Sequence, residues 1–279
     1  MQRITPQHVQ RAVIALLWAL ASVAVALLLF IVIYVLVRGF PVFSFRFLFG
    51  FPEGIGESGG ILPFIVATVY LTFLAILIGS PLGIGTAIFL TEYTRETWLN
   101  KSIRFGADCL AGIPSIIYGL FGFIFFVMYL GMGFSILSGA LAMALMVLPT
   151  IIRTSEEAIR AVPPQYRDVT YGLGATRWQM VSRVILPSAM PGIVTGIVLS
   201  VGRTISETAV VMLTAGSALS VPVSPFDPGC TLSLRIYILA LEGISEQMAY
   251  GIAAVLVISI LAINTIAYWL MHRVMRRFR

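Results

Sequence analysis

Two opposite charges, Arg203 and Glu207, lie inside one of the most apolar stretches of the chain. An arginine at the centre of a membrane helix costs about 2.5–3.5 kcal/mol on insertion scales, so it normally serves a function there. Because the two residues are four apart, a continuous helix would place them on one face. The guanidinium group can bind oxyanion oxygens through two parallel hydrogen bonds. The pair therefore favours an oxyanion site on a transport path, with an ion pair that only stabilises helix packing as the alternative.

The composition is that of an all-α integral membrane protein. Of 279 residues, 59% are hydrophobic and only 11% are charged, whereas soluble domains carry about a quarter charged residues. A soluble fold cannot bury this much apolar surface. The net charge of +6 is explained by arginines that flank membrane segments on one side. We therefore expect a membrane lipid environment and no nucleic-acid partner.

Six apolar stretches are long enough to cross a bilayer, which takes about 20 residues per helix. They cover residues 12–37, 61–91, 104–131, 133–152, 187–215 and 248–271. The second and third are interrupted by glycine and proline, which allows them to be tilted or kinked. The sequence thus predicts a polytopic protein with six transmembrane helices.

Lysine and arginine are distributed unequally between the two sides of these spans. The outer side would carry Arg38, Arg46 and Arg235, and Arg203 lies within a span. The inner side would carry Arg3, Arg11, Arg95, Lys101, Arg104, Arg153, Arg160, Arg167, Arg177, Arg183, Arg273, Arg276, Arg277 and Arg279. Because positive residues accumulate on the cytoplasmic side, we expect both termini in the cytoplasm.

The third span contains a proline, Pro114, that should break its helix. A broken membrane helix can present free N–H groups to an anion. Pro114 and Ser115 are therefore candidates for the translocation path, and a plain kink for packing is the alternative.

A long polar segment, residues 153–186, separates the fourth and fifth spans. Pro163 should end the preceding helix, residues 165–173 can form a short helix, and Gly174 is a natural turn residue. Residues 176–185 can form a second helix before Leu186 and Pro187 open the next span. Two short helices on the membrane surface would serve either as an amphipathic connector or as a docking surface for a partner.

The spacing of Asp168, Gly174, Val184, Leu186 and Pro187 resembles the EAA loop of ABC importer permeases. That pattern is Glu-Ala-Ala, three residues, Gly, nine residues, then Ile-x-Leu-Pro, and this chain differs at its start, where it has Asp-Val-Thr. The resemblance implies a type I ABC importer permease of MetI-like architecture. It also implies a loop that couples to an ATPase, with the residues Asp168, Gly174, Ala175, Thr176, Arg177, Trp178, Leu186 and Pro187.

Further stretches resemble the phosphate branch of these permeases. They are GGILPFIVATVYLT from Gly59, PLGIGTAIFLTEY from Pro81, LAGIPSIIYGLFG from Leu110, LPTIIRTSEEAIRAVP from Leu148 and VGRTISETAVVMLTAG from Val201. Two more, VPVSPFDPG from Val221 and SLRIYILALEG from Ser233, resemble the PstA-type subunit of that branch more than its PstC-type partner. The resemblance divides the chain into residues 1–58, with the first span and an outer loop, and a permease domain over residues 59–279. In the stretch from Val201, that branch has Gly-Arg-Ala-Ile-Gly-Glu-Thr-Ala. Thr204 and Ser206 differ from this pattern, while Arg203 and Glu207 match it.

What the resemblance implies is an inner-membrane subunit of a bacterial ATP-driven importer of inorganic phosphate. Its partners would be two ATPase subunits, a second PstC-like permease and a phosphate-binding protein outside. The chain lacks the G-x-x-x-x-G-K-[ST] phosphate loop, so we expect no cofactor, catalytic residue or metal in it, with ATP and magnesium on the partner ATPase. The alternatives are a permease for another oxyanion or small solute, and a secondary transporter or membrane scaffold without an ATPase.

Overall fold

The structure, a computed structural model, describes residues 6–94 and 97–275 and is dominated by helices. The longest are α1 (Pro6–Gly39), α3 (Leu62–Ile88), α6 (Ile136–Arg160), α9 (Leu186–Ile205) and α12 (Glu246–Met275). The shorter ones are α4 (Trp98–Ala111), α5 (Ser115–Gly122), α7 (Gln165–Gly172), α8 (Arg177–Met180), α10 (Ala209–Thr214) and α11 (Leu232–Leu241). Three π-helical stretches, η2 (Phe89–Tyr93), η3 (Phe123–Tyr129) and η4 (Val181–Ile185), extend α3, α5 and α8.

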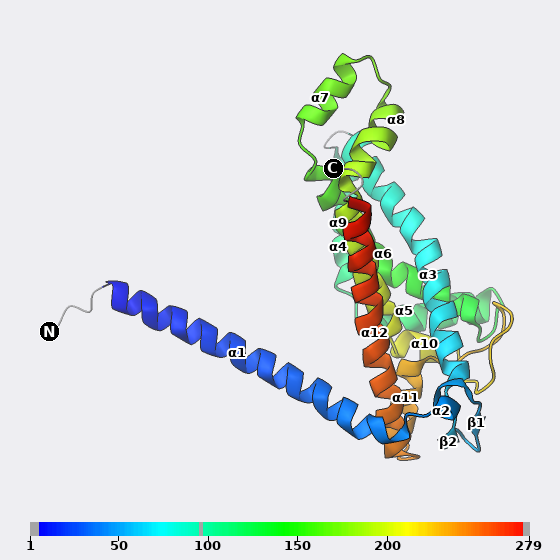
Figure 1. Cartoon of the computed structure of the whole chain (residues 1–279). Helices are drawn as coiled ribbons and strands as arrows, with labels where there is room; N and C mark the ends of the chain where they lie inside the picture. The colour runs from blue at the N-terminus through cyan, green and yellow to red at the C-terminus, as the bar shows by residue number, and fades with distance from the viewer. Residues whose placement is uncertain (1–5, 95–96, 276–279) are drawn as a thin grey trace.

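Figure 1 shows α3, α6, α9 and α12 gathered in one elongated bundle, with α7 and α8 projecting from one end. The last described turns of α12 lie at that same end. At the opposite end lie the 3₁₀ turn η1 (Phe40–Val42), α2 (Phe45–Phe49), α11 and a small antiparallel hairpin of β1 (Pro52–Glu53) and β2 (Ser58–Gly59). Two ends of different structure are therefore separated by the apolar length of the bundle.

The bundle is held together by small residues that let helices approach closely, as is typical in membranes. A Cβ atom added at Gly83 of α3 would lie 2.6 Å from Cγ2 of Ile151 in α6. At Gly139 of α6, an added Cβ would lie 2.9 Å from Cδ1 of Leu71 in α3. Large side chains such as Met143 fill the remaining space and are fully buried. The pair α3 and α6 forms the centre of the core.

The first span, α1, leaves the bundle at the hairpin end and lies away from it (Figure 1). The most apolar part of α1 has no residue that the rest of the described chain buries. An apolar helix cannot present such a surface to water, so lipid or another chain must cover it. Residues 1–58 as a separate unit stay a prediction.

Five helices are long and apolar enough to cross a membrane among the described residues, and a bent pair supplies a sixth span if it is counted as one. The third predicted span, residues 104–131, is sharply bent, because α4 and the helix from Ser115 to Tyr129 meet at 100°. Pro114 breaks the helix as predicted, with an extended ψ of 140°. The hydroxyl of Tyr118 donates a hydrogen bond of 2.7 Å to the carbonyl of Leu110 across the bend, which fixes the two arms.

The expected fifth span, residues 187–215, also differs from the structure. Its helix begins earlier, because Arg177–Ile205 is one continuous apolar span. It ends at Ile205, and the separate helix α10 begins only at Ala209. Leu186 and Pro187 therefore lie inside a helix, where the π-helical η4 passes into α9, and do not open one.

Candidate functional site

Arg203 lies in the last turn of α9, and Glu207 lies beyond the end of that helix. The expectation that both share one helix face is wrong, because the helix stops between them. No ion pair joins the two side chains, both of which belong to the described part of the chain. Arg203 is exposed within this chain. A cation at the carbonyl end of a helix is favoured by the helix dipole, so the position itself tolerates the charge.

Glu207 has a structural task that the sequence did not reveal. Its Oε1 accepts hydrogen bonds from the backbone N–H of Ala209 at 3.2 Å and of Val210 at 3.5 Å. The carboxylate thus satisfies donors in the first turn of α10, as a capping side chain does. Glu207 therefore bonds to the backbone at the start of α10 and does not bind Arg203.

Contacts with α11 stabilise the break between α9 and α10. Ser233 donates a hydrogen bond of 2.9 Å to the carbonyl of Ser206, and its hydroxyl also contacts that of Thr208. Ser206 in turn donates to the carbonyl of Gly202 at 3.0 Å. These bonds satisfy polar groups that a broken helix would otherwise leave unpaired at membrane depth.

The two broken spans meet in space. A Cβ added at Gly119 of α5 would lie 3.1 Å from Cα of Val210, and one added at Gly122 would lie 2.8 Å from Cγ2 of Thr214. The order of these contacts shows that α5 and α10 run in the same direction, with their first residues within about one or two helical turns of each other. Arg203 precedes the end of α9 at Ile205 by two residues, so it lies directly before this second break.

The remaining translocation candidates lie at the start of α5. Pro114 is exposed and precedes the helix, and Ser115, which is half-buried, is its first residue. The proline carbonyl accepts a hydrogen bond of 3.0 Å from the N–H of Ile117. The structure thus brings both breaks and Arg203 into one region, while the transport roles of these residues stay a prediction.

Gly119 and Gly122 allow α5 to pack closely on α10, as small residues do between membrane helices. Gly131, beyond the end of the same span, has a different role. It has a φ of +66°, and a Cβ added there would meet nothing within 4 Å. Gly131 is therefore a turn residue, and glycine suits this position because it adopts a positive φ without steric cost.

The polar segment forms the predicted helical loop at one end of the bundle. α7 is followed by Gly174, which adopts a φ of +78°. Thr176 then caps α8 through a reciprocal pair of hydrogen bonds with Gln179. The second half differs from the prediction, because α8 continues through η4 into α9 as one rod. The loop is thus one short helix and the protruding end of a span.

Most predicted coupling residues are exposed at this end. Asp168, Gly174, Thr176, Arg177 and Trp178 are exposed, Ala175 and Leu186 are half-buried, and Pro187 is exposed on the helix below. Leu173, next to the turn, is 83% exposed, and Trp178 is 66% exposed. Large apolar side chains at a protruding tip are typical of a protein-binding surface.

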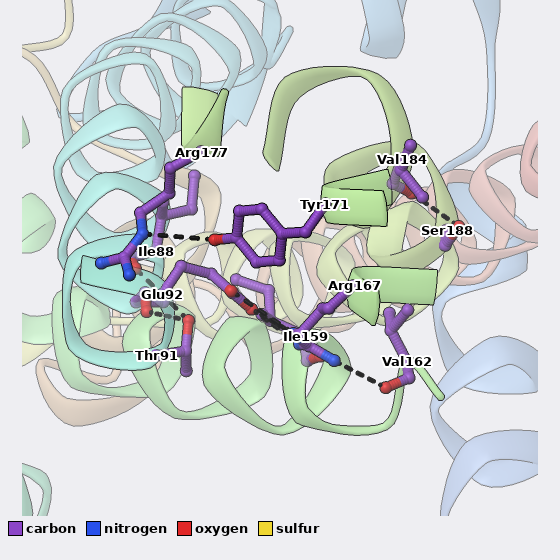
Figure 2. A network of polar contacts seen from close by, with 11 residues as sticks. Ile88, Thr91, Glu92, Ile159, Val162, Arg167, Tyr171, Arg177, Val184 and Ser188 are labelled. Carbon is purple, nitrogen blue, oxygen red and sulfur yellow. Dashed lines mark hydrogen bonds and ion pairs between the residues drawn. The ribbon is translucent and has the colours of Figure 1, made fainter. Parts of the chain in front are cut away.

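Sequence reasoning missed the ionic contacts that hold this loop to the bundle. Figure 2 shows Arg167 of α7 between Glu92 of η2 and the carbonyl groups of Ile159 and Val162. The sequence alone identifies Arg167 only as a positive residue on the inner side. The partners are 75 residues apart in the sequence, so no local signal could pair them.

Three further ion pairs involve residues of α4 and α6. Glu156, whose side chain is only 6% exposed, binds Arg104 of α4 and Arg160 of α6 at 2.8 Å each. Arg153 of α6 pairs with Asp108 of α4. These contacts attach α4, the first arm of the bent pair, to α6.

The profile of one protein family, described as binding-protein-dependent transport system inner membrane component, matches residues 79–279. The chain belongs to this family. It is 35% identical over 266 residues to a probable ABC transporter permease protein, YqgI, of Bacillus subtilis (strain 168), covering 90% of each chain. It is 37% identical over 248 residues to the probable phosphate transport system permease protein PstA of Methanocaldococcus jannaschii, covering 88% of this chain and 87% of the relative. It is 35% identical over 225 residues to PstA 1 of Mycobacterium tuberculosis (strain H37Rv), covering 80% of this chain and 73% of the relative.

Solved structures of ABC transporters share the fold. A bacterial alginate ABC transporter in complex with a periplasmic protein aligns with a TM-score of 0.71 and 17% identity, covering 98% of each chain. The inward-facing MetNI methionine ABC transporter aligns with a TM-score of 0.65 and 19% identity, covering 77% of this chain and 95% of that one. The chain is therefore a multi-pass membrane permease with the MetI-like arrangement of helices.

Proposed function

We propose that this chain is one of two permease subunits of an ATP-driven importer of inorganic phosphate. Relatives named as PstA phosphate permeases support the substrate, since they are 34–40% identical over large parts of the chain. The observation in the structure that carries the proposal is Arg203, an exposed guanidinium where two broken spans meet. Guanidinium binds phosphate oxygens in a bidentate manner, and a broken helix at membrane depth is a typical substrate site.

In this proposal the second, PstC-like permease provides the other half of the path and covers the exposed side of Arg203. A phosphate-binding protein delivers the ion at the hairpin end. Two ATPase subunits, which bind ATP and magnesium, dock on the loops of the two permeases. Closure of the ATPases moves the spans and exposes the site alternately to each side.

The function is tested by uptake of radiolabelled phosphate into proteoliposomes that contain this chain, a matched second permease, the ATPase and the binding protein. We expect ATP-dependent uptake that is competed by unlabelled phosphate and not by sulfate or molybdate. Uptake of sulfate or molybdate in place of phosphate would leave the ABC permease assignment and overturn the substrate. Uptake that continues without the ATPase would instead indicate a secondary transporter.

The proposed orientation places both termini and the α7–α8 loop in the cytoplasm of a bacterial inner membrane. The uneven distribution of arginine supports it. In a variant with Leu173→Cys and Cys109→Ala, a membrane-impermeant thiol reagent should label inverted membrane vesicles and leave intact spheroplasts unlabelled. Labelling of spheroplasts would reverse the orientation.

A further inference from the structure

α7 is attached through one side chain to two spans that are distant in the sequence. Arg167 Nη2 donates to Glu92 Oε1 at 2.6 Å and to the carbonyl of Ile159 at 3.1 Å. Its Nε donates to the same carboxylate oxygen at 3.1 Å, and Nη1 donates to the carbonyl of Val162 at 3.0 Å (Figure 2). Glu92 continues α3 through η2, and the two carbonyl groups lie at the end of α6. One guanidinium group thus joins the first turn of α7 to α3 and α6.

The joint is sheltered from solvent. The side chain of Glu92 is 6% exposed and that of Arg167 is 24% exposed. Charge-assisted hydrogen bonds are shorter and stronger than neutral ones, and a low local dielectric strengthens them further. Only the planar fork of arginine can reach a carboxylate and two carbonyl groups at once. The arrangement therefore fixes the direction of α7 as well as its position.

A second contact holds the other half of the loop to the same stretch of chain. The guanidinium carbon of Arg177 in α8 lies 5.8 Å from the ring centre of Tyr93, the neighbour of Glu92. Arg177 also donates a hydrogen bond of 3.3 Å to the hydroxyl of Tyr171 in α7. Both halves of the loop thus contact η2, while α7 and α8 project from the bundle (Figure 1) and the side chain of Leu173 between them is exposed.

Chain connectivity alone would not move α3 with the loop. The loop continues directly from α6 and into α9, whereas Glu92 is separated from Arg167 by 75 residues. The side-chain joint therefore supplies a direct connection that the backbone lacks. A push on the exposed tip would act on α3 through Glu92, on α6 through its terminal carbonyl groups, and on α9 through the continuous α8.

We propose that Glu92 and Arg167 form the pivot through which the α7–α8 loop transmits ATPase closure to α3 and α6. The inference rests on the proposed importer function, because it requires an ATPase docked on the loop. Both are positioning residues: neither contacts ATP nor the transported ion. Breaking the pivot leaves the loop able to bind the ATPase, but its motion then reaches the spans incompletely.

The test measures phosphate imported per ATP hydrolysed by the complete complex in proteoliposomes, with the amount of assembled complex determined separately. The variants are Arg167→Ala, Glu92→Gln and Arg167→Lys, and the matched control is Arg183→Ala, an exposed arginine of the same segment. We expect Arg167→Ala and Glu92→Gln to lower the ratio about ten-fold while basal ATP hydrolysis stays within about two-fold, a typical coupling magnitude. Arg167→Lys should give a ratio of phosphate to ATP between those of Arg167→Ala and the unmutated chain. The lysine ammonium group keeps the charge but lacks the planar, bidentate geometry of guanidinium.

An assembled Arg167→Ala complex that imports as much phosphate per ATP as the unmutated one would overturn the inference. So would variants that reduce only the yield of complex, because a merely structural pair changes assembly and not the ratio. If the unmutated complex transports another solute, the substrate proposal fails, and the same ratio measured with that solute still decides whether the pivot exists.

Discussion

Arg203 lies in the last turn of α9, at the carbonyl end of the helix. The carbonyl end of α9 carries partial negative charge, which favours a cation, and Glu207 is occupied with the N–H groups of α10. A guanidinium group that is exposed in this chain and not neutralised by Glu207 remains available to a transported anion. The separation of the two charges thus favours a binding role over a self-neutralising pair.

Replacing Arg203 with glutamine should abolish phosphate uptake and leave the complex assembled. Glutamine keeps hydrogen-bonding capacity but loses the charge and the bidentate fork. Uptake in proteoliposomes and co-purification with the partner chains would be measured together, with Arg203→Lys as the charge-retaining comparison. Normal uptake by the glutamine variant would remove Arg203 from the path.

The two cysteines should differ sharply in reactivity. Cys109 is exposed within this chain and Cys230 is buried. Burial raises the pKa of the Cys230 thiol to about 12, although Arg235 nearby acts in the opposite direction. The reactive thiolate is therefore nearly absent from the folded protein at pH 8–9.

We expect maleimide to label Cys230 at pH 8.5 only after unfolding, which mass spectrometry of the labelled peptides would show. Because an unfolded cysteine ionises at a pKa of about 8.5, this thiol lowers stability as pH rises from there toward 12. A Cys230→Ser variant should remove that part of the alkaline loss. Rapid labelling of Cys230 in the intact complex would contradict its burial.

Among the elements, the loop of α7 and α8 depends on one residue for its shape. Gly174 has a φ of +78°, and a Cβ added there would meet nothing within 4 Å. Any penalty for a side chain at this position therefore comes from the backbone conformation, which costs other L-residues about 1–2 kcal/mol. Asparagine adopts this conformation more readily than β-branched residues do.

Gly174→Val should consequently reduce ATP-dependent uptake several-fold, and Gly174→Asn should stay close to the unmutated chain. Asparagine adopts the left-handed backbone conformation more readily than valine does, whereas the side chain of either residue would enter open space. Uptake and ATP hydrolysis of the reconstituted complex would be compared. Equal loss in both variants would mean that side-chain bulk at an ATPase contact decides, and not the turn.

At the scale of the whole molecule, the core between α3 and α6 requires residues without side chains. Gly83 faces Ile151, whose side chain is fully buried, at a distance that leaves no room for a methyl group. Gly85, two residues along the same helix, faces open space. The same substitution at the two positions thus separates helix packing from helix propensity.

Gly83→Ala should destabilise the protein by about 1–3 kcal/mol, since overpacking forces side chains and backbone apart. Gly85→Ala should be neutral or slightly stabilising, because alanine is favoured over glycine in a helix by up to about 1 kcal/mol. Thermal unfolding of the two purified variants would give the comparison. A lower melting temperature for Gly85→Ala than for Gly83→Ala would argue against the observed contact of α3 with α6.

The sequence alone determined the features that local physics governs. Apolar length predicted the spans, Pro114 predicted the break of the third, and the spacing around Gly174 predicted the loop. Each depends on a hydrophobic run, a missing N–H group or a left-handed turn, which neighbouring residues reveal.

Only the tertiary structure decided how those parts act on one another. The break after Ile205 is stabilised by Ser233 of another helix. It contains no proline or glycine, so no local sequence pattern predicts it. The same is true of Glu92 and Arg167, whose pairing requires α3 and α7 to meet. Helical periodicity reports which face of a segment is apolar, whereas a long-range hydrogen bond depends on where the chain returns in space.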